Sequence, residues 1–261
     1  MTGKAANRWS TIWLFTVLTF LYVPMLSVVL GSLANTRYMR FPHEVWTFDA
    51  YRNALADYTT GILHSTSFSI AGIVVLLAAL VGTAGALAFA RYDWRGRRLY
   101  QRFLLLPVFF PQSVLGLALL LTFTAAGITP TWKTAVFAHL VWIVPIVTLV
   151  ISIRLYNYDP RQEEAAIDLG ASRWQVFCYI TLPVIAPGVV SGSLFAFLLS
   201  WSNLPLSIFT TGADTTLPEW LFVRTATNYS PLVPAVAVIA TLVSAAVISV
   251  IAFLWLVLRR R

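Results

Sequence analysis

The chain has 261 residues, of which 59% are hydrophobic and only 11% are charged, with a formal net charge of +8 and a mean hydropathy of +0.78. These values exclude a water-soluble globule with a charged coat and indicate an integral membrane protein. The single cysteine, Cys178, excludes an intrachain disulfide and a cysteine-rich metal site.

Six apolar runs are long enough to cross a membrane, because a hydrocarbon core of roughly 30 Å needs about 20 helical residues. Their length and their lack of strand-like alternation predict an all-α membrane fold. The first run has no small-residue cleavage site after it, so we expect a span and not a signal peptide. Since no linker divides the chain, the runs predict one membrane domain over residues 1–261. In chain order they are Trp9–Leu33, Ser65–Ala90, Phe103–Ala125, Lys133–Ser152, Val184–Trp201 and Val233–Leu258.

The basic residues are divided unequally between the two sides of the membrane. Most of the 18 Lys and Arg residues fall on the side of the two termini, among them the run "RYDWRGRR" at residues 91–98. Because cytoplasmic loops carry an excess of Lys and Arg, both termini and the loop of residues 153–183 are predicted to be cytoplasmic. The positive charge is thus explained by topology and lipid headgroups, and not by nucleic acid. The basic residues expected outside are Arg37, Arg40, Arg52, Lys133 and Arg224.

Two small-residue faces predict close helix packing. The stretch "GTAGALA" lies in the second run, and Gly188-x-x-x-Gly192 lies in the fifth. Small residues allow two helix backbones to approach within the membrane, so these faces indicate packing and say little about chemistry.

A polar segment separates the fourth and fifth runs. Asp159 followed by Pro160, with Gln162 near the helix start, is typical of a capped helix N-terminus. Gly170 is the usual helix stop, so a short helix is expected over residues 160–169. We call residues 153–183 the coupling segment.

A second short helix follows in the coupling segment. Ser172 and Gln175 repeat the capping-box pattern, and this helix is expected to end before Pro183.

The first short helix presents an acidic face beside a shallow one. Glu164 and Asp168 lie one turn apart and repel each other, and Ala165 and Ala166 leave the adjacent surface flat. Such a surface is suited to a groove on another protein, although an ordinary amphipathic connector would share it.

The coupling segment also matches a family signature. Its spacing is that of the EAA loop, with a Glu-Ala-Ala triplet, a glycine and a final Ile-x-Leu-Pro. The chain therefore resembles the permease subunits of type I ATP-binding cassette (ABC) importers. The resemblance implies a loop that inserts into a cleft on a cytoplasmic ATPase. The coupling residues that it implies are Glu164, Ala165, Ala166, Asp168, Gly170, Ala171 and Ser172.

The resemblance extends along most of the chain. The stretches "WTFDAYRNAL", "FARYDWRGRR", "LLLPVFFPQSVLGLALLLTF" and "TLPEWLFVRTATNYSPLVPAVAVIATL" are similar to permeases of the polyamine (spermidine and putrescine) importer branch. It implies a multi-pass protein of a bacterial inner membrane that transports a small amino-bearing solute. The implied partners are a second homologous permease, two ATPase subunits that hold ATP and Mg²⁺, and a periplasmic solute-binding protein.

The sequence has no catalytic motif of its own. A phosphate-binding G-x-x-x-x-G-K-[ST] loop is missing, since the one Gly-Lys pair is Gly3-Lys4, and H-E-x-x-H and nucleophile-elbow motifs are missing as well. We therefore expect no enzymatic activity and no bound cofactor. An ion-coupled carrier usually keeps ionisable groups inside the bilayer, where this chain has chiefly His139. That carrier class and a membrane scaffold without transport remain the alternatives.

The stretch "LLSWSNLPLSIF" at the end of the fifth run is a candidate part of the solute pathway. Trp201 offers a ring face for an alkylammonium group, and Ser202 and Asn203 offer hydrogen bonds. Pro205 is expected to break the helix so that backbone lines a cavity. The polyamine branch typically carries acidic residues at the positions of Ser202 and Asn203, so a singly charged or zwitterionic amine fits here as well as a polyamine. His139 is a further pathway candidate.

Overall fold

The structure is a computed structural model that describes residues 3–34 and 45–259. The regular secondary structure of these residues is helical, apart from one isolated antiparallel bridge between Ala34 and Trp46. The chain falls into two compact units, which are residues 1–62 with 220–249 and residues 63–219 with 250–261. Arg37 and Arg40, which are expected outside the membrane, lie beyond the described residues, as do Arg260 and Arg261.

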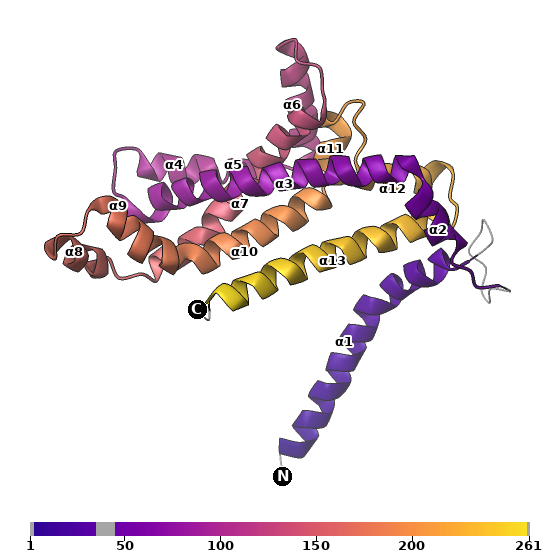
Figure 1. Ribbon diagram of the computed structural model, residues 1–261, viewed down its shortest axis with the longest axis horizontal. Helices are drawn as coiled ribbons and strands as arrows, with labels where there is room; N and C mark the ends of the chain where they lie inside the picture. The colour runs from indigo at the N-terminus through magenta and orange to yellow at the C-terminus, as the bar shows by residue number, and fades with distance from the viewer. Residues whose placement is uncertain (1–2, 35–44, 260–261) are drawn as a thin grey trace. The chain divides into compact units, whose positions relative to one another are not determined.

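The described residues confirm the all-α class (Figure 1). Two of the helical elements, η1 and η2, are single π-helical turns. In chain order the helices are α1 (Gly3–Ser32), α2 (Asp49–Ala56), α3 (Tyr58–Ala86), η1 (Leu87–Arg91), α4 (Arg97–Leu104), α5 (Leu106–Phe109), α6 (Gln112–Ala125), α7 (Trp132–Tyr156), α8 (Arg161–Asp168), α9 (Arg173–Val176), η2 (Phe177–Thr181), α10 (Leu182–Trp201), α11 (Leu204–Thr210), α12 (Leu217–Thr227) and α13 (Leu232–Arg259).

Five helical stretches are long and apolar enough to cross a membrane, and a bent helix pair makes up to six. They follow the order of the expected runs, and their number is six if the bent pair is one span. The unbroken stretches are Trp9–Ser32, Tyr58–Arg91, Trp132–Tyr156, Arg173–Trp201 and Leu232–Val257.

The third expected run, Phe103–Ala125, differs from a single straight helix. Its residues are divided between Arg97–Phe109 and Gln112–Ala125, which meet at an angle of 103°. Phe110 and Pro111 have extended backbone at the bend, with ψ angles of 138° and 130°. A proline disfavours helical backbone in the residue before it, so the break follows from Pro111. Apolar composition alone did not reveal it.

Helix α7 packs against α3 and α10 through the expected glycines. A Cβ atom on Gly82 of α3 would lie 2.7 Å from Val147 Cγ1, and one on Gly192 of α10 would lie 3.0 Å from the same atom. A Cβ on Gly188 would lie 3.3 Å from Ile151 Cα. Val147 and Ile151 are completely buried. The two small-residue faces thus let three helices pack at backbone distance.

The other unit contains α1, α2 and the chain between them. Thr47 N donates to Leu33 O over 2.9 Å, and the hydroxyl groups of Ser32 and Tyr51 lie 2.5 Å apart. These contacts hold the end of α1 against α2.

Candidate functional site

The coupling segment begins with the expected short helix, but the expected cap is wrong, since Asp159 is not the N-cap residue and the N-cap residue itself makes no side-chain cap hydrogen bond. Asp159 Oδ1 accepts a hydrogen bond from Arg161 N over 3.0 Å, and α8 starts at Arg161 with Pro160 as its N-cap residue. The helix ends at Asp168. Gly170 follows with a φ angle of +92°, a left-handed conformation that glycine adopts without strain.

The capping box of the second short helix is present. Ser172 Oγ accepts from Gln175 N, and Gln175 Oε1 accepts from Ser172 N, over 3.3 and 2.8 Å. The expected end of this helix before Pro183 is wrong. Helix α9 continues through η2 into α10, so the helical stretch runs from Arg173 to Trp201. The π-helical turn directly before Leu182 and Pro183 changes the hydrogen-bond ladder, which is how a helix can pass a proline.

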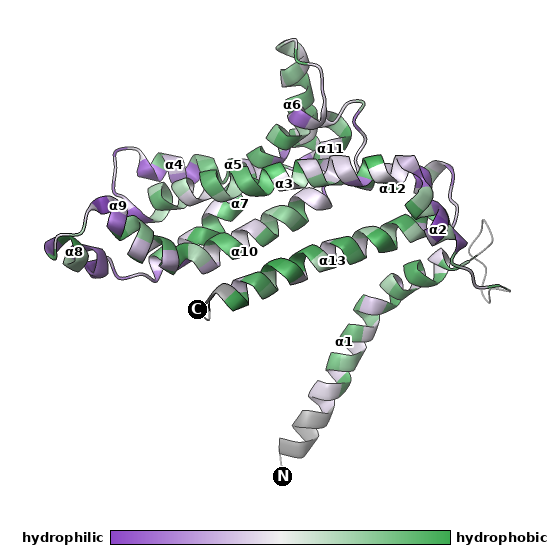
Figure 2. Cartoon of the chain, viewed as in Figure 1, coloured by the Kyte–Doolittle hydropathy of each residue, from purple (hydrophilic) through white to green (hydrophobic). Residues whose placement is uncertain are grey.

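The expected coupling residues lie on an exposed knob formed by α8, Gly170 and α9. Several residues there are coloured as hydrophilic, at the same end as the start of α4 (Figure 2). Of the expected residues, only Ala166 and Ala171 are half-buried, and the exposed ones are Glu164, Ala165, Asp168, Gly170 and Ser172.

Large apolar side chains are also exposed on the coupling segment. Leu169 is 90% exposed, Tyr179 77% and Trp174 72%, and Ile167 is exposed beside them. Exposed apolar side chains near a charged surface are typical of a protein interaction site. Sequence reasoning singled out the acidic and small residues of this knob but not these four.

Glu163 is half-buried, whereas its neighbour Glu164 is exposed. The Glu163 carboxylate accepts from Arg91 Nη2 over 2.6 Å and from Thr181 Oγ1 over 2.8 Å. Glu163 and Arg91 side chains are only 17% and 19% exposed. Sequence reasoning assigned Arg91 to a topology anchor and did not single out Glu163 or Thr181. No local signal marks Glu163, because adjacent residues of a short helix can both be exposed, as Glu164 and Ala165 are.

Tyr158 lies beside this ion pair. The Arg91 guanidinium carbon is 5.9 Å from the centre of the Tyr158 ring. Burial, and then the Glu163 carboxylate, raise the pKa of Tyr158, whereas Arg91 lowers it. The hydroxyl group is buried and has no hydrogen-bond partner among the described residues.

The pathway candidates lie at the junction of α10 and α11. His139 of α7 is 1% exposed, and its two ring nitrogens lie 2.9 Å from Ser200 Oγ and 3.0 Å from Ser207 Oγ. Asn203 is buried and caps α11, because its Oδ1 accepts from Leu206 N over 3.0 Å.

The remaining candidates differ in exposure. Trp201 is buried, with its ring centre 4.6 Å from that of Phe68 and 5.8 Å from that of Phe197. Ser202 is exposed and donates to Leu198 O. The helix break expected at Pro205 falls at Ser202 and Asn203 instead, with Pro205 in the first turn of α11.

A narrow crevice of about 160 Å³ brings three of these candidates together. It is too tight for a water-sized sphere. Its lining residues are Ser67, Ile70, His139, Ser200, Trp201, Asn203, Ser207, Thr216 and Pro218.

Comparison with known proteins places these features in a family. Residues 77–261 match the family described as "Binding-protein-dependent transport system inner membrane component". The putrescine transport system permease protein PotI of Escherichia coli K12 is 34% identical over 251 residues, covering 92% of this chain and 87% of the relative. The chain belongs to this family of transport-system membrane components. It is therefore a multi-pass inner-membrane permease subunit of an ABC importer.

Further relatives agree in sequence and fold. The spermidine/putrescine transport system permease protein PotC of Haemophilus influenzae is 32% identical over 236 residues, covering 90% of this chain and 91% of the relative. A bacterial ABC transporter involved in the import of alginate has a TM-score of 0.71 at 14% identity, with 96% of both chains covered. The MetNI methionine ABC transporter, in an inward-facing form, has a TM-score of 0.58 at 14% identity, covering 76% of this chain and 94% of that one. These two structures show the shared fold.

Family membership decides between the classes left open by the sequence. Permease subunits of ABC importers have no ATPase site of their own, and they work with an ATPase and a periplasmic binding protein. The ion-coupled carrier and the membrane scaffold are therefore excluded.

Proposed function

We propose that the chain forms half of the translocation pathway for a small amino-bearing solute and that its coupling segment docks on a partner ATPase. The complex would contain a second homologous permease, two ATPase subunits and a periplasmic binding protein. ATP and Mg²⁺ would be bound by the ATPase subunits, and this chain would bind no cofactor.

The observation that carries the coupling role is the exposed apolar surface of the knob. Leu169 and Trp174 of the knob present large side chains to the surroundings, and the acidic Glu164 and Asp168 of the same knob are exposed as well. Burial of such side chains in a groove is favourable, and the acids at the rim set charge complementarity. ATP-driven closure of the ATPase subunits would move the knob and, with it, the attached spans. The ligand-driven states would then differ in contacts, as coupling between two sites requires.

The solute class is supported by the relatives and by the neutral candidate residues. PotI and PotC are named for putrescine and spermidine transport. Ser202 and Asn203 carry no charge, so a singly charged or zwitterionic amine or amino acid is as compatible as a polyamine. His139, Trp201 and Asn203 are packed against their neighbours in the narrow crevice. A solute would therefore reach them only after the surrounding helices separate.

A reconstituted complex tests both parts of the proposal. The chain, its co-encoded permease, ATPase and binding protein are placed in proteoliposomes, and uptake of radiolabelled putrescine, spermidine and neutral amino acids is measured with and without ATP. ATP-dependent uptake of at least one amine or amino acid is expected. Glu164→Lys should leave membrane insertion intact and reduce uptake and ATPase association. Uptake of none of these compounds, or normal uptake by Glu164→Lys, would contradict the proposal.

A further inference from the structure

One side chain of the coupling segment, Glu163, contacts residues at the ends of two spans. Helix α3 is extended by the π-helical turn η1, whose last residue is Arg91, and α10 is preceded by the π-helical turn η2, whose last residue is Thr181. Arg91 contacts Glu163 Oε2 and Thr181 contacts Glu163 Oε1. Each carboxylate oxygen therefore serves a different span. π-helical turns inside longer helices are frequent at functional sites.

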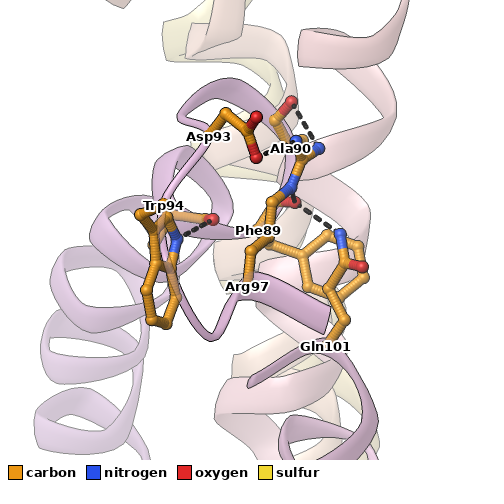
Figure 3. Close-up of polar contacts among 7 residues, drawn as sticks. Phe89, Ala90, Asp93, Trp94, Arg97 and Gln101 are labelled. Carbon is orange, nitrogen blue, oxygen red and sulfur yellow. Dashed lines mark hydrogen bonds and ion pairs between the residues drawn. The ribbon is translucent and has the colours of Figure 1, made fainter. Parts of the chain in front are cut away.

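The end of η1 is held in place by side chains of the following loop and of α4 (Figure 3). Arg97 Nε and Gln101 Nε2 donate to Phe89 O over 3.1 and 2.8 Å, and Arg97 Nη2 donates to Ala90 O over 3.3 Å. Trp94 Nε1 donates to Ala88 O over 2.9 Å. These side chains satisfy carbonyl groups that a helix end leaves without intrahelical partners. Arg91 thus projects from a fixed helix end and not from a frayed one.

The contact among Arg91, Glu163 and Thr181 is largely shielded from solvent. Arg91 and Glu163 are less than one-fifth exposed, and Thr181 is 5% exposed. Removing one partner of such a pair leaves an uncompensated charge, which is far more costly than loss of a surface ion pair. The exposed Glu164 on the same helix makes no comparable contact in the described chain. The two adjacent glutamates therefore have different surroundings.

We propose that Glu163 is a positioning residue that transmits movement of the knob to α3 and α10 together. Glu164 and the exposed apolar residues would face the ATPase, and Glu163 would face inward and connect the knob to the spans. This inference rests on the proposed coupling function. It adds a forked link, with one arm to Arg91 and one to Thr181, that the family signature does not include.

The decisive quantity is the amount of solute imported per ATP hydrolysed by the reconstituted complex, with putrescine as the first probe and the amine or amino acid that the wild type imports best as the second. Loss of folded protein lowers import and hydrolysis in proportion, whereas a broken link lowers their ratio. Glu163→Gln keeps the size and removes the charge. We expect it to co-purify with the ATPase and to import about tenfold less solute per ATP, or less still, because the Arg91 charge is left without its counter-ion.

Matched variants distinguish loss of the Glu163 contacts from general loss of folded protein. The exchange Arg91→Glu with Glu163→Arg restores an ion pair and leaves Thr181 as an acceptor, so we expect it to regain most of the lost import. Thr181→Val removes one arm and should give an intermediate ratio. Tyr158→Phe removes a hydroxyl group without a described partner next to the pair, so its ratio should equal that of the wild type.

Two results would overturn the inference. One is a wild-type ratio in Glu163→Gln, and the other is loss of ATPase association in that variant, which would assign Glu163 to docking. Leu169→Ala distinguishes this inference from the function on which it rests. If Leu169→Ala binds the ATPase normally, the docking proposal fails; if Leu169→Ala loses binding while Glu163→Gln keeps the wild-type ratio, only the link fails.

Discussion

His139 Nε2 of α7 and Ser207 Oγ of α11 lie 3.0 Å apart in a buried site. The other ring nitrogen contacts Ser200 of α10, so one imidazole joins three helices. Such a side chain fixes the position of the short helix α11 relative to the two spans. The same imidazole lines the crevice that contains Trp201 and Asn203.

His139→Ala is expected to lower stability by about 1–3 kcal/mol, because a buried hydroxyl loses its partner. The measurement is the thermal unfolding midpoint in detergent. Unfolding is monitored through the reaction of a thiol reagent with Cys178, the one cysteine of the chain. Ser202→Ala is the control, since Ser202 is exposed at the same helix junction and should leave the midpoint unchanged. Equal midpoints for His139→Ala and the wild type would show that the three-helix contact adds nothing to stability.

Gly82→Ala and Gly72→Ala should change stability in opposite directions. A Cβ at Gly82 would meet Val147 Cγ1 at 2.7 Å, whereas nothing lies within 4 Å of one at Gly72. Overpacking costs about 1–3 kcal/mol, and replacing a helical glycine by alanine gains up to about 1 kcal/mol where space allows. Both residues belong to α3, so the pair is matched in helix and in composition. The same unfolding assay applies, and a stabilised Gly82→Ala would contradict the close approach of α3 and α7.

Leu169→Ala is expected to weaken ATPase binding by about tenfold or more, because burial of a leucine side chain contributes about 1.5–3 kcal/mol. The dissociation constant is measured with the permease pair in nanodiscs and the purified ATPase. Leu76→Ala provides the control, since Leu76 is 62% exposed on α3 and lies away from the coupling segment. If both variants bind like the wild type, the proposal that the knob docks on the ATPase fails.

Gly170→Val is expected to lower import through the backbone alone. The φ angle of +92° costs an L-residue about 1–2 kcal/mol, and nothing lies within 4 Å of an added Cβ. Gly170→Asn is the matched variant, since asparagine tolerates left-handed backbone better than a β-branched residue does. Import should therefore rank as wild type, then Asn, then Val. The reverse order for the two variants would point to side-chain contact with a partner and not to backbone strain.

The sequence predicts much of this molecule where the controlling interactions are local. Apolar runs predict the spans, and the capping pattern of Ser172 and Gln175 predicts α9, because both depend on neighbours within one or two turns. The bend at Pro111 was missed because the residues around it are apolar enough to continue the span. The continuation of α9 into α10 was missed because a π-helical turn has no simple residue pattern.

The remaining misses involve residues far apart in the chain. Arg91 and Glu163 are 72 positions apart, and His139 and Ser207 are 68. Arg91, Glu163 and Ser207 look ordinary in their own stretches of sequence, and His139 stands out there only without its partners. Their pairing depends on how α3, α7, α10 and α11 are assembled, which composition and periodicity do not specify.

The exposed side chains of Leu169 and Trp174 have a consequence for the life of the newly made protein. If the knob docks on an ATPase as proposed, a copy inserted into the lipid without that partner would leave these apolar side chains uncovered. Such a copy is open to aggregation and to proteases that remove orphan subunits, so its survival depends on balanced synthesis of its partners. The surface proposed to bind the ATPase would then also be the surface by which an unassembled subunit is recognised and degraded.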